Sequence, residues 1–352
     1  MISIIGAGPS GNYLAYLLAK KGEKVNVYEE HKSIGKPIQC TGILTDGITK
    51  VFDVNNEYVV NEINKVRVFS PKENYLDFNI KKNFIVNRSL FDGYLAGEAS
   101  GAGAKYFLGS KFNGCSINNG IRININNEIK DTKYLVGADG PFSAVAKSAG
   151  MYGRRRFIIG PQARVKLSIE EDTMEVYLGY GSFGWVVPES RNVARLGVIS
   201  YHNSNLYFRK LVKRRGCKII EYQSGVIPVY DPSLKIQNGD VFLIGDAATQ
   251  VKSLTFGGIL PGLIAAEELS KSFRDYEKNF KRRIGMDLWL HQFLRKRMDK
   301  FDDNDYEFLV KLFKRNAVKE VIESYGRDYP SKYLLNLVFT EPRLLYFSKF
   351  LF

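Results

Sequence analysis

The first thirty residues contain the feature that most constrains the fold. The segment "ISIIGAGPSGNYLAYLLAKKGEKVNVYEE" gives, in order, an apolar strand over 2–5, a glycine-rich turn, a helix and a second strand. Gly6, Gly8 and Gly11 form a GxGxxG pattern at the turn. In such a turn the first glycine allows a tight bend, the second lets a pyrophosphate approach the backbone, and the third lets the helix pack closely. The pattern predicts a βαβ unit that binds a dinucleotide at the start of the helix.

Acidic residues end the second strand of this unit. Glu29 stands about where dinucleotide-binding proteins place a carboxylate on a ribose diol, and Glu30 follows it. We therefore expect cofactor contacts from both the turn and the strand end. The residues concerned are Gly6, Ala7, Gly8, Pro9, Ser10, Gly11, Glu29 and Glu30.

Two later segments repeat the strand, turn and helix pattern. In "YLVGADGPFSAVAKSAG", 134–150, a strand leads into Asp139 and a helix. In the segment 239–273, a strand over 241–244 is followed by Asp246, a glycine pair at 257–258 and a helix from about Ile259. The positive end of that helix would face whatever group the glycines admit.

Together these segments resemble the three FAD fingerprints of the flavoprotein superfamily that includes p-hydroxybenzoate hydroxylase. The segment "NRSLFDGYLAGEA", 87–99, is similar to the arginine-plus-helix element of that superfamily, with Arg88 directed towards the cofactor. The resemblance implies bound FAD, with Asp246 beside the ribityl chain. The further cofactor contacts that it implies are Arg88, Asp139, Asp246, Gly257, Gly258 and Ile259, and a second resemblance, given below, adds Cys40.

The segments between these motifs have strand character. Alternating residues in 56–84 and 156–234 indicate a largely antiparallel sheet, which in this architecture forms the substrate domain. We expect an α/β fold with a Rossmann-like FAD-binding domain, the inserted sheet domain and a helical C-terminal region. The expected bounds are 1–55, 85–155 and 235–275 for the FAD-binding domain, 56–84 and 156–234 for the substrate domain, and 276–352 for the helices.

The stretch "GYGSFGWVVP", 179–188, combines glycines with large aromatic residues. It resembles the Tyr-x-Trp-x-Phe-Pro element of the geranylgeranyl reductase family, whose archaeal-type members saturate lipids. Trp185 and Pro188 match that element, whereas Phe183 and Val187 depart from it. The resemblance implies a tunnel for a polyprenyl chain, in which glycines leave room beside the backbone. The lining residues would be Phe183, Gly184 and Pro188, together with Trp185. A bend between strands with packed aromatic rings is the alternative.

A cysteine gives the second match to this family. Cys40 lies in "GKPIQCTGIL", 35–44, where the family has a cysteine in the loop after the ribose-binding strand, close to the flavin. The resemblance gives Cys40 a role as a reactive thiol or proton relay, and an inert cysteine is the alternative. The catalytic candidates are Cys40, Tyr180 and Trp185. Ser253 and Phe256 depart from the family, which has a proline and a glycine at these positions.

The resemblance implies an FAD-dependent oxidoreductase that saturates isolated C=C bonds of geranylgeranyl chains in membrane lipids or their precursors. Hydride would come from N5 of the reduced flavin, with assisted protonation of the alkene. No second GxGxxG unit is visible, so electrons would come from ferredoxin or from transiently bound NAD(P)H. Two alternatives stay open: an FAD-dependent monooxygenase or halogenase on an apolar substrate, and a basic lipid-binding protein that retains the fold without catalysis.

Charge suggests an anionic partner. The chain has 51 basic and 37 acidic residues, a net charge of +14. Within 276–300, eight basic and three acidic residues accompany apolar Ile284, Leu288 and Phe293. Contact with an anionic membrane surface would suit this composition. A solvated, lysine-rich surface and helices that pack as a cap on the protein are the alternatives. No motif that reads nucleic acid accompanies the charge, so we expect no nucleic-acid partner.

The remaining sequence signals concern location and metals. No run of eighteen apolar residues occurs, and the N-terminus lacks the features of a signal peptide. We therefore expect a cytoplasmic protein, peripheral on the inner face of the membrane. The three cysteines form no CxxC pair, and His291 has no partner at metal-ligand spacing, so we expect no metal site.

Overall fold

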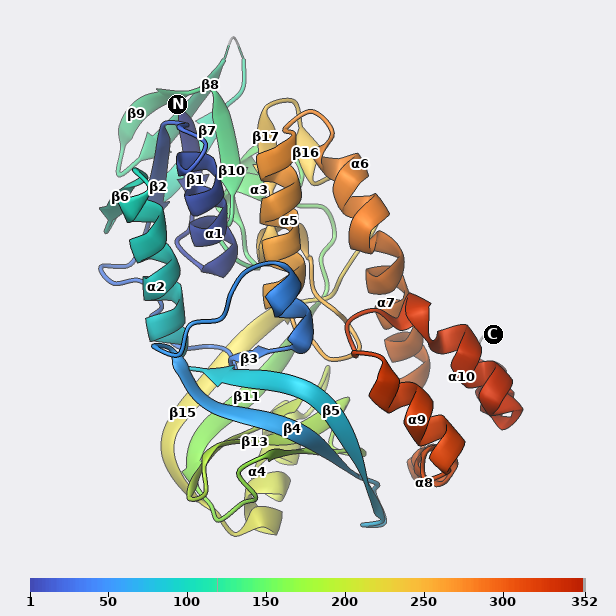
Figure 1. Cartoon of the computed structure of the whole chain (residues 1–352). Helices are drawn as coiled ribbons and strands as arrows, with labels where there is room; N and C mark the ends of the chain where they lie inside the picture. The colour runs from blue at the N-terminus through green and yellow to red at the C-terminus, as the bar shows by residue number, and fades with distance from the viewer. Residues whose placement is uncertain (119, 351–352) are drawn as a thin grey trace. The chain divides into compact units, whose positions relative to one another are not determined.

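The computed structural model describes residues 1–118 and 120–350, which form two compact units. The first unit comprises Met1–Ile38, Asn87–Arg156 and Ile227–Leu288, and the second comprises Gln39–Val86, Phe157–Val226 and Trp289–Phe352. The expected fold class is confirmed: a Rossmann-like part, a large, mostly antiparallel sheet and C-terminal helices (Figure 1). Residues 39–55 pack with the second unit, although the sequence predicts them in the FAD-binding domain. Residues 276–288 pack with the first unit, although the sequence predicts them in the helical region.

A six-stranded sheet forms the centre of the first unit, in the order β16-β17-β10-β1-β2-β6. The strands from β17 to β6 run parallel, and β16 is antiparallel to its neighbour. All four residues of β1 are buried, as is typical of a parallel strand with both faces covered. The strands are β1 (Ile2–Ile5), β2 (Val25–Glu29), β6 (Lys105–Leu108), β10 (Tyr134–Gly137), β16 (Gln237–Asn238) and β17 (Val241–Leu243).

Helices cover the first unit's sheet. The helix α1 (Pro9–Ala19) packs between α2 (Arg88–Gly101) and α5 (Ile259–Lys271), as Figure 1 shows. The start of α5 at Ile259 confirms the expected position. Further along the chain come α6 (Tyr276–Phe280), a π-helical turn η3 (Lys281–Gly285) and α7 (Met286–Met298).

A small antiparallel sheet in the first unit was not predicted. Its strands are β7 (Phe112–Ser116), β8 (Ile121–Ile125) and β9 (Glu128–Thr132). In β8 the three isoleucines are buried and alternate with polar residues. This alternation is typical of a strand with one buried face. The short helix α3 (Ala144–Ser148) packs against β7.

An eight-stranded sheet organises the second unit, in the order β15-β11-β14-β13-β12-β4-β5-β3. Most neighbouring pairs are antiparallel, and β12 with β4 is parallel. The helix α4 (Ser204–Arg215), which was not predicted, packs on one face through Phe208 and Leu211. The strands are β3 (Ile43–Leu44), β4 (Val59–Phe69), β5 (Tyr75–Val86), β11 (Phe157–Lys166), β12 (Thr173–Tyr177), β13 (Phe183–Ser190), β14 (Val193–Ile199) and β15 (Lys218–Pro228).

The C-terminal part of the second unit is helical, as expected. It contains α8 (Asp303–Phe313), α9 (Asn316–Ser324), α10 (Leu334–Thr340) and the 3-10 segment η5 (Pro342–Phe350). Asp302 and Asp305 form a capping box at the start of α8. Within the described residues, no helix has the length and apolar character needed to cross a membrane.

Candidate functional site

The glycine-rich turn of the first unit shows why each glycine is present. Gly6 has a φ of +102°, and a Cβ there would lie 2.4 Å from the carbonyl oxygen of Ala138. A Cβ on Gly11 would lie 2.2 Å from the carbonyl oxygen of Gly6, so the helix could not pack as closely. At Gly8 no atom lies within 4 Å of the Cβ position. Gly8 is also the N-cap of α1 and provides no side-chain cap. The N–H groups at the start of α1 therefore border an open space, which fits a pyrophosphate.

Glu29 is fixed beside this turn. One carboxylate oxygen accepts a hydrogen bond from the backbone N–H of Ala7 at 2.8 Å, and the other accepts from the N–H of His31 at 2.9 Å. These contacts hold the carboxylate at the end of β2, next to the glycines, where a ribose diol would be bound. Glu30 is exposed, as expected for the next residue along a strand. Glu29, rather than Glu30, therefore reaches the turn.

A buried acid and an arginine lie near the third glycine-rich segment. Burial raises the pKa of Asp246 to about 6, and the positive charge of Arg88 opposes this rise. A Cβ on Gly258 would lie 2.9 Å from Oδ1 of Asp246, so the carboxyl group lies against the backbone that begins α5. Arg88 donates two hydrogen bonds to Asp92, at 3.0 and 2.8 Å. The charge of Arg88 thus acts on Asp246, and the contacts of both residues with a cofactor stay predictions.

Asp139 has a clear local role. Its carboxylate accepts hydrogen bonds from the hydroxyl of Ser143 at 2.6 Å and from the N–H of Val145 at 3.0 Å. Burial raises the pKa of this carboxyl, and the two hydrogen bonds oppose the rise. Asp139 therefore shapes the turn between β10 and α3. Its contact with a cofactor stays a prediction.

Sequence reasoning missed the groups that hold the Asp246 turn in place. The side-chain oxygen of Gln250 accepts a hydrogen bond from the N–H of Gly245 at 2.7 Å, and its amide group donates to the hydroxyl of Tyr276 at 2.9 Å. Tyr276 in turn donates to the carbonyl of Leu243 at 2.7 Å. Both side chains are fully buried. No sequence pattern could reveal this network, because Gln250 and Tyr276 are 26 residues apart.

Phe256, which stands where the family has a glycine, precedes the pair Gly257–Gly258. Phe256 has a φ of +53°, in the left-handed region that favours glycine. The glycine that the family has at this position therefore corresponds to the backbone conformation seen here. Lys252 is buried, and its Cε would lie 3.2 Å from a Cβ on Gly257. The turn thus keeps the backbone shape that the family's glycine would provide.

These residues of the first unit fit a flavin dinucleotide. An open space borders the start of α1 at Gly8, Glu29 is held where a ribose diol would lie, and Asp246 stands against Gly258. Side chains larger than hydrogen at Gly258 would collide with Asp246. The set matches the donor and acceptor groups that a pyrophosphate, a ribose and a polyol chain require.

In the second unit, the side chains of β13 alternate between the two faces of the sheet. Val186 belongs to the core that α4 covers, with Leu196 and Leu211. Phe183 and Trp185 point to the other face, with ring centroids 5.8 Å apart. Trp185 pairs with Gly197 across the strands, and a Cβ on Gly197 would lie 2.3 Å from the Trp185 ring. Gly197, which the sequence analysis did not single out, therefore leaves room for Trp185.

The structure corrects the expectation for Gly184. A Cβ on Gly184 would lie 2.8 Å from a methyl group of Leu211 in α4, so Gly184 faces the helix and not the side of Trp185. The space beside its backbone is filled by the core. Gly179 and Gly181 have φ values of +80° and +67°, as a tight turn between β12 and β13 requires. The glycines of this stretch thus serve the turn and the packing of α4.

Tyr180 is not brought together with Cys40. Its ring packs against the core on the α4 side, with its centroid 6.0 Å from that of Tyr177. The guanidinium of Arg214 in α4 lies 5.9 Å from the Tyr180 ring. Tyr180 therefore lies in the α4-side core, and its catalytic role stays a prediction.

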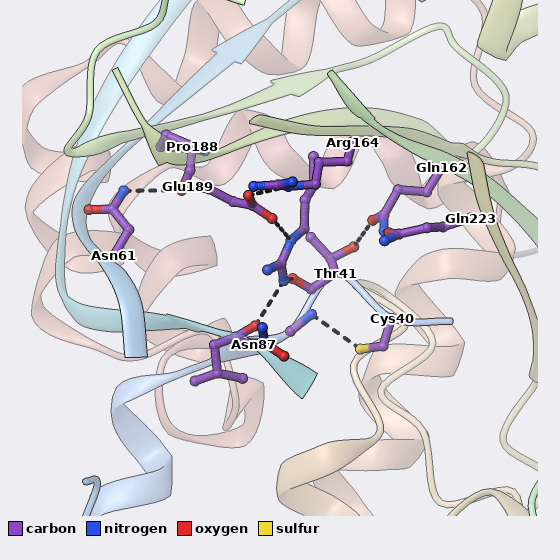
Figure 2. A network of polar contacts seen from close by, with 12 residues as sticks. Cys40, Thr41, Asn61, Asn87, Gln162, Arg164, Pro188, Glu189 and Gln223 are labelled. Atoms are coloured by element: carbon purple, nitrogen blue, oxygen red, sulfur yellow. Dashed lines mark hydrogen bonds and ion pairs between the residues drawn. The ribbon is translucent and has the colours of Figure 1, made fainter. Parts of the chain in front are cut away.

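Polar contacts join residues 40–42 to side chains of the second unit's sheet, as Figure 2 shows. The thiol of Cys40 accepts a hydrogen bond from the N–H of Gly42 at 3.3 Å. The next residue, Thr41, donates through its hydroxyl to the side-chain oxygen of Gln162, and the indole N–H of Trp185 donates to the same oxygen. The structure thus connects the neighbourhood of Cys40 with Trp185, two of the predicted catalytic residues.

Pro188 lies at a strand irregularity on the same strand. It is buried, and its carbonyl accepts a hydrogen bond from the side chain of Asn61 at 3.0 Å. The register of β13 with β14 shifts between Pro188 and Ser190. Pro188 therefore shapes the end of β13, and its contact with a substrate stays a prediction.

Metal ligands do not gather in the part of the chain that the structure describes: no three His, Cys, Asp or Glu side chains there could hold an ion. His291 is fully buried in α7, with Nε2 3.3 Å from the backbone oxygen of Asp328. It packs inside the second unit.

Comparison with known proteins shows what this chain is similar to. Residues 4–54 match the model of the NAD(P)-binding Rossmann-like domain. The chain is 27% identical to the digeranylgeranylglycerophospholipid reductase of Methanocaldococcus jannaschii, over 99% of this chain and 97% of that protein. The reductase of the same name from Thermoplasma acidophilum is 26% identical, over 94% and 96%. The resemblance to the geranylgeranyl reductase family is confirmed. The predicted class, an oxidoreductase of the geranylgeranyl reductase type, is confirmed with it.

Solved structures agree on the fold. A geranylgeranyl bacteriochlorophyll reductase-like protein from Thermoplasma acidophilum superposes with a TM-score of 0.86, at 23% identity, over 98% of this chain and 97% of that one. A flavin-dependent brominase superposes with a TM-score of 0.69, at 19% identity, over 92% of each chain. The geranylgeranyl reductase fold is thus matched along almost the whole chain. Together with the Rossmann-like domain, these neighbours support a flavin cofactor.

Proposed function

We propose that the chain is an FAD-dependent reductase that saturates isolated C=C bonds in the geranylgeranyl chains of membrane lipids or their precursors. One observation carries the proposal: the similarity to digeranylgeranylglycerophospholipid reductases spans nearly the whole length of both proteins. The open space at Gly8 and the fixed carboxylate of Glu29 support the choice of a dinucleotide form of flavin.

Residues of the first unit would hold the FAD. The N–H groups that follow Gly8 would bind the pyrophosphate, and Glu29 would accept hydrogen bonds from the ribose. Arg88 and Asp246 would bind near the ribityl chain. When bound and reduced, FAD supplies the hydride for the alkene.

The Trp185 side of the second unit's sheet would receive the apolar chain. Phe183 and Trp185 offer neighbouring aromatic surfaces, and only 8% of Trp185 is exposed. An isolated alkene has no carbonyl group to accept electron density, so a proton must be delivered as hydride adds. We propose that Cys40 holds this proton, because its loop is connected to Trp185 through Gln162.

Anaerobic turnover tests the function. The protein would be reduced with dithionite and incubated with a geranylgeranyl glycerophospholipid, and the lipid would be analysed by mass spectrometry. We expect the mass to rise by two hydrogens for each bond that is saturated. The electron donor in the cell, ferredoxin or NAD(P)H, can be identified by replacing dithionite with each in turn.

A second candidate has some support from the fold. Flavin-dependent halogenases and monooxygenases superpose on this chain, among them a p-nitrophenol 4-monooxygenase from Pseudomonas putida with a TM-score of 0.71. Oxygen consumption coupled to NAD(P)H, with an oxygenated or halogenated product, would favour this candidate. A purified protein without the yellow colour of a flavin would favour a non-catalytic lipid-binding role.

We also propose contact with an anionic membrane surface, through a face different from the one that composition suggested. In the 281–300 segment, Ile284 and Leu288 are buried and pack inside the protein. Met286 and Trp289 in that segment are exposed. A larger group of exposed apolar side chains lies on α10 and η5, which we call the α10–η5 face. They are Leu335 at 73%, Phe339 at 80%, Leu345 at 58% and Tyr346 at 48% exposure.

Charge at the α10–η5 face fits an anionic surface. The carboxylate of Glu341 is 1% exposed and binds two arginines, Arg315 and Arg343, whose side chains are more than half exposed. One buried negative charge is thus matched by two positive charges that reach solvent. The excess positive charge, next to apolar side chains, suits the headgroup region of an anionic bilayer.

A further inference from the structure

We infer that Gln162 is a positioning residue that fixes the Cys40 loop, residues 39–42, relative to the side chain of Trp185. The inference deepens the proposed function, since Cys40 and Trp185 are the residues proposed to serve the alkene. The sequence gives no signal for Gln162, because it lies outside both the Cys40 segment, 35–44, and the Trp185 segment, 179–188.

A single oxygen atom of Gln162 connects the two residues. Its Oε1 accepts one hydrogen bond from the hydroxyl of Thr41 at 2.5 Å and another from the indole N–H of Trp185 at 3.3 Å. Its Nε2 donates to the side chain of Gln223 in β15 at 2.5 Å, which fixes the orientation of the amide. Gln162 is 4% exposed, so water cannot easily replace these partners. Because the two donors share this oxygen atom, a displacement of the Trp185 ring would also alter the hydrogen bond that Thr41 donates to it.

A second anchor holds the backbone of the same loop. Nη1 of Arg195 donates to the carbonyl oxygens of Thr41 and Val86. Nε of Arg195 donates to Glu189 at 2.6 Å, and Arg164 donates to the other oxygen of that carboxylate at 2.6 Å. Burial raises the pKa of Glu189, but the two arginines hold it below its ordinary value. The charged Glu189 therefore keeps Arg195 directed at the loop.

The two anchors have different roles. Arg195 fixes the backbone position of the loop, and its Nη1 lies 2.8 Å from where a Cβ on Gly42 would be, so the loop passes close to the guanidinium. Gln162 fixes the side chain of Thr41 relative to Trp185. Because the thiol of Cys40 accepts from the N–H of Gly42, its position follows that of the loop. A substrate chain that moves the Trp185 ring would therefore change the position of the Cys40 thiol through Gln162 and Thr41.

Thiol reactivity tests the inference without flavin or lipid, so its failure can be distinguished from failure of the proposed function. Cys115 and Cys217 would be replaced by serine, which leaves Cys40 as the only thiol. The alkylation rate of Cys40 by iodoacetamide would be followed by intact mass, and the melting temperature would be recorded for each variant. Thr41→Val keeps the shape of the side chain but removes the hydroxyl, and Thr41→Ser restores the hydroxyl.

We expect Thr41→Val and Trp185→Phe each to raise the alkylation rate by about fivefold, the change that loss of one ordinary hydrogen bond produces. Thr41→Ser should stay within about twofold of the background protein. Because both donors share Oε1 of Gln162, the double variant should show less than the product of the two single effects. A matched control is Arg67→Lys in β4, which weakens an Arg67–Asp77 ion pair of the same sheet.

Two results would overturn the inference. One is a Cys40 rate that Thr41→Val and Trp185→Phe leave within about twofold of background, whatever their melting temperatures. The other is an equal rise in Arg67→Lys, which would show that the rate reports general loosening of the sheet. Multiplicative effects in the double variant would contradict the shared acceptor.

Discussion

Asp246 shows at the scale of one residue how a binding site can reduce stability. Burial raises its pKa from 3.8 to about 6, so the folded protein binds this proton more tightly than the unfolded chain does. The ionised carboxylate is therefore destabilising, and the free energy of unfolding falls as pH rises from about 4 to about 6. We expect Asp246→Asn to be more stable than the parent by about 3 kcal/mol at neutral pH, with the difference vanishing below pH of about 4.

Urea unfolding of cofactor-free protein at several pH values measures this difference. The same Asp246→Asn variant should bind FAD more weakly, because the amide is a poorer acceptor for ribityl hydroxyls. A parent and a variant whose stabilities change in parallel between pH of about 4 and about 7 would contradict the assigned burial of Asp246.

Gly8 and Gly11 provide a matched pair for the cofactor site. Gly8 has an extended backbone, φ −78° and ψ 179°, and open space at its Cβ position, so Gly8→Val should leave the cofactor-free protein as stable as the parent. The valine would instead occupy the space for the pyrophosphate and abolish FAD binding. Gly11→Ala should lower the melting temperature, because its Cβ would lie 2.2 Å from the carbonyl oxygen of Gly6.

Flavin absorbance of the purified variants, and chromatography of the cofactor released by heat, check this pair. Release of FMN or a nicotinamide dinucleotide from the parent protein would contradict the assignment of Glu29 and Asp246. Yellow Gly8→Val protein with parental flavin content would show that the pyrophosphate lies elsewhere.

Among the elements, β13 and its neighbour β14 carry two glycines, Gly184 and Gly197, on which added side chains should have different effects. Gly184→Ala would meet Leu211 at 2.8 Å on the α4 side, and we expect a loss of about 1–3 kcal/mol of stability with an unchanged preference for chain length. Gly197→Ala would meet the Trp185 ring at 2.3 Å and should displace it. We expect Gly197→Ala to slow reduction of geranylgeranyl substrates more than that of geranyl substrates.

Melting temperatures and reduction rates on the two chain lengths test this separation. If Gly184→Ala changes the preference for chain length and Gly197→Ala does not, the assignment of the two faces of β13 is wrong.

How much could be predicted from the sequence differs between elements. The βαβ unit and the start of α5 at Ile259 could be predicted because their signals are local: a glycine pattern, buried strands and a helix start within a few residues. The face of Gly184 could not, because a strand's pattern does not say which side a helix such as α4 will cover. The positions of Gln162 and Gln250 depend on contacts with distant residues, Trp185 and Tyr276, which a single sequence does not reveal.

At the scale of the whole molecule, the net charge of +14 and the α10–η5 face predict binding to anionic vesicles. Phe339→Glu should weaken this binding severalfold, because it replaces an apolar side chain that is 80% exposed with a negatively charged one. Ile129→Glu is the matched control, since Ile129 is 63% exposed on β9 of the first unit. Salt should also weaken binding, because exposed charges are screened beyond about 10 Å at 0.1 M salt.

Co-sedimentation with vesicles of anionic and of neutral phospholipid measures the effect. Equal binding of the parent to both kinds of vesicle would remove the electrostatic part of the proposal. An undiminished affinity of Phe339→Glu for anionic vesicles would remove the α10–η5 face as the contact.

We propose that this chain reduces the double bonds of geranylgeranyl lipids with a flavin bound at the Gly8 turn. The most direct measurement is the mass of a geranylgeranyl glycerophospholipid after anaerobic incubation with dithionite-reduced protein, compared between the parent and Gly8→Val. We expect the parent to add two hydrogens per double bond and Gly8→Val to add none. An unchanged lipid mass with a parent protein that is fully loaded with FAD and reduced would contradict the proposal.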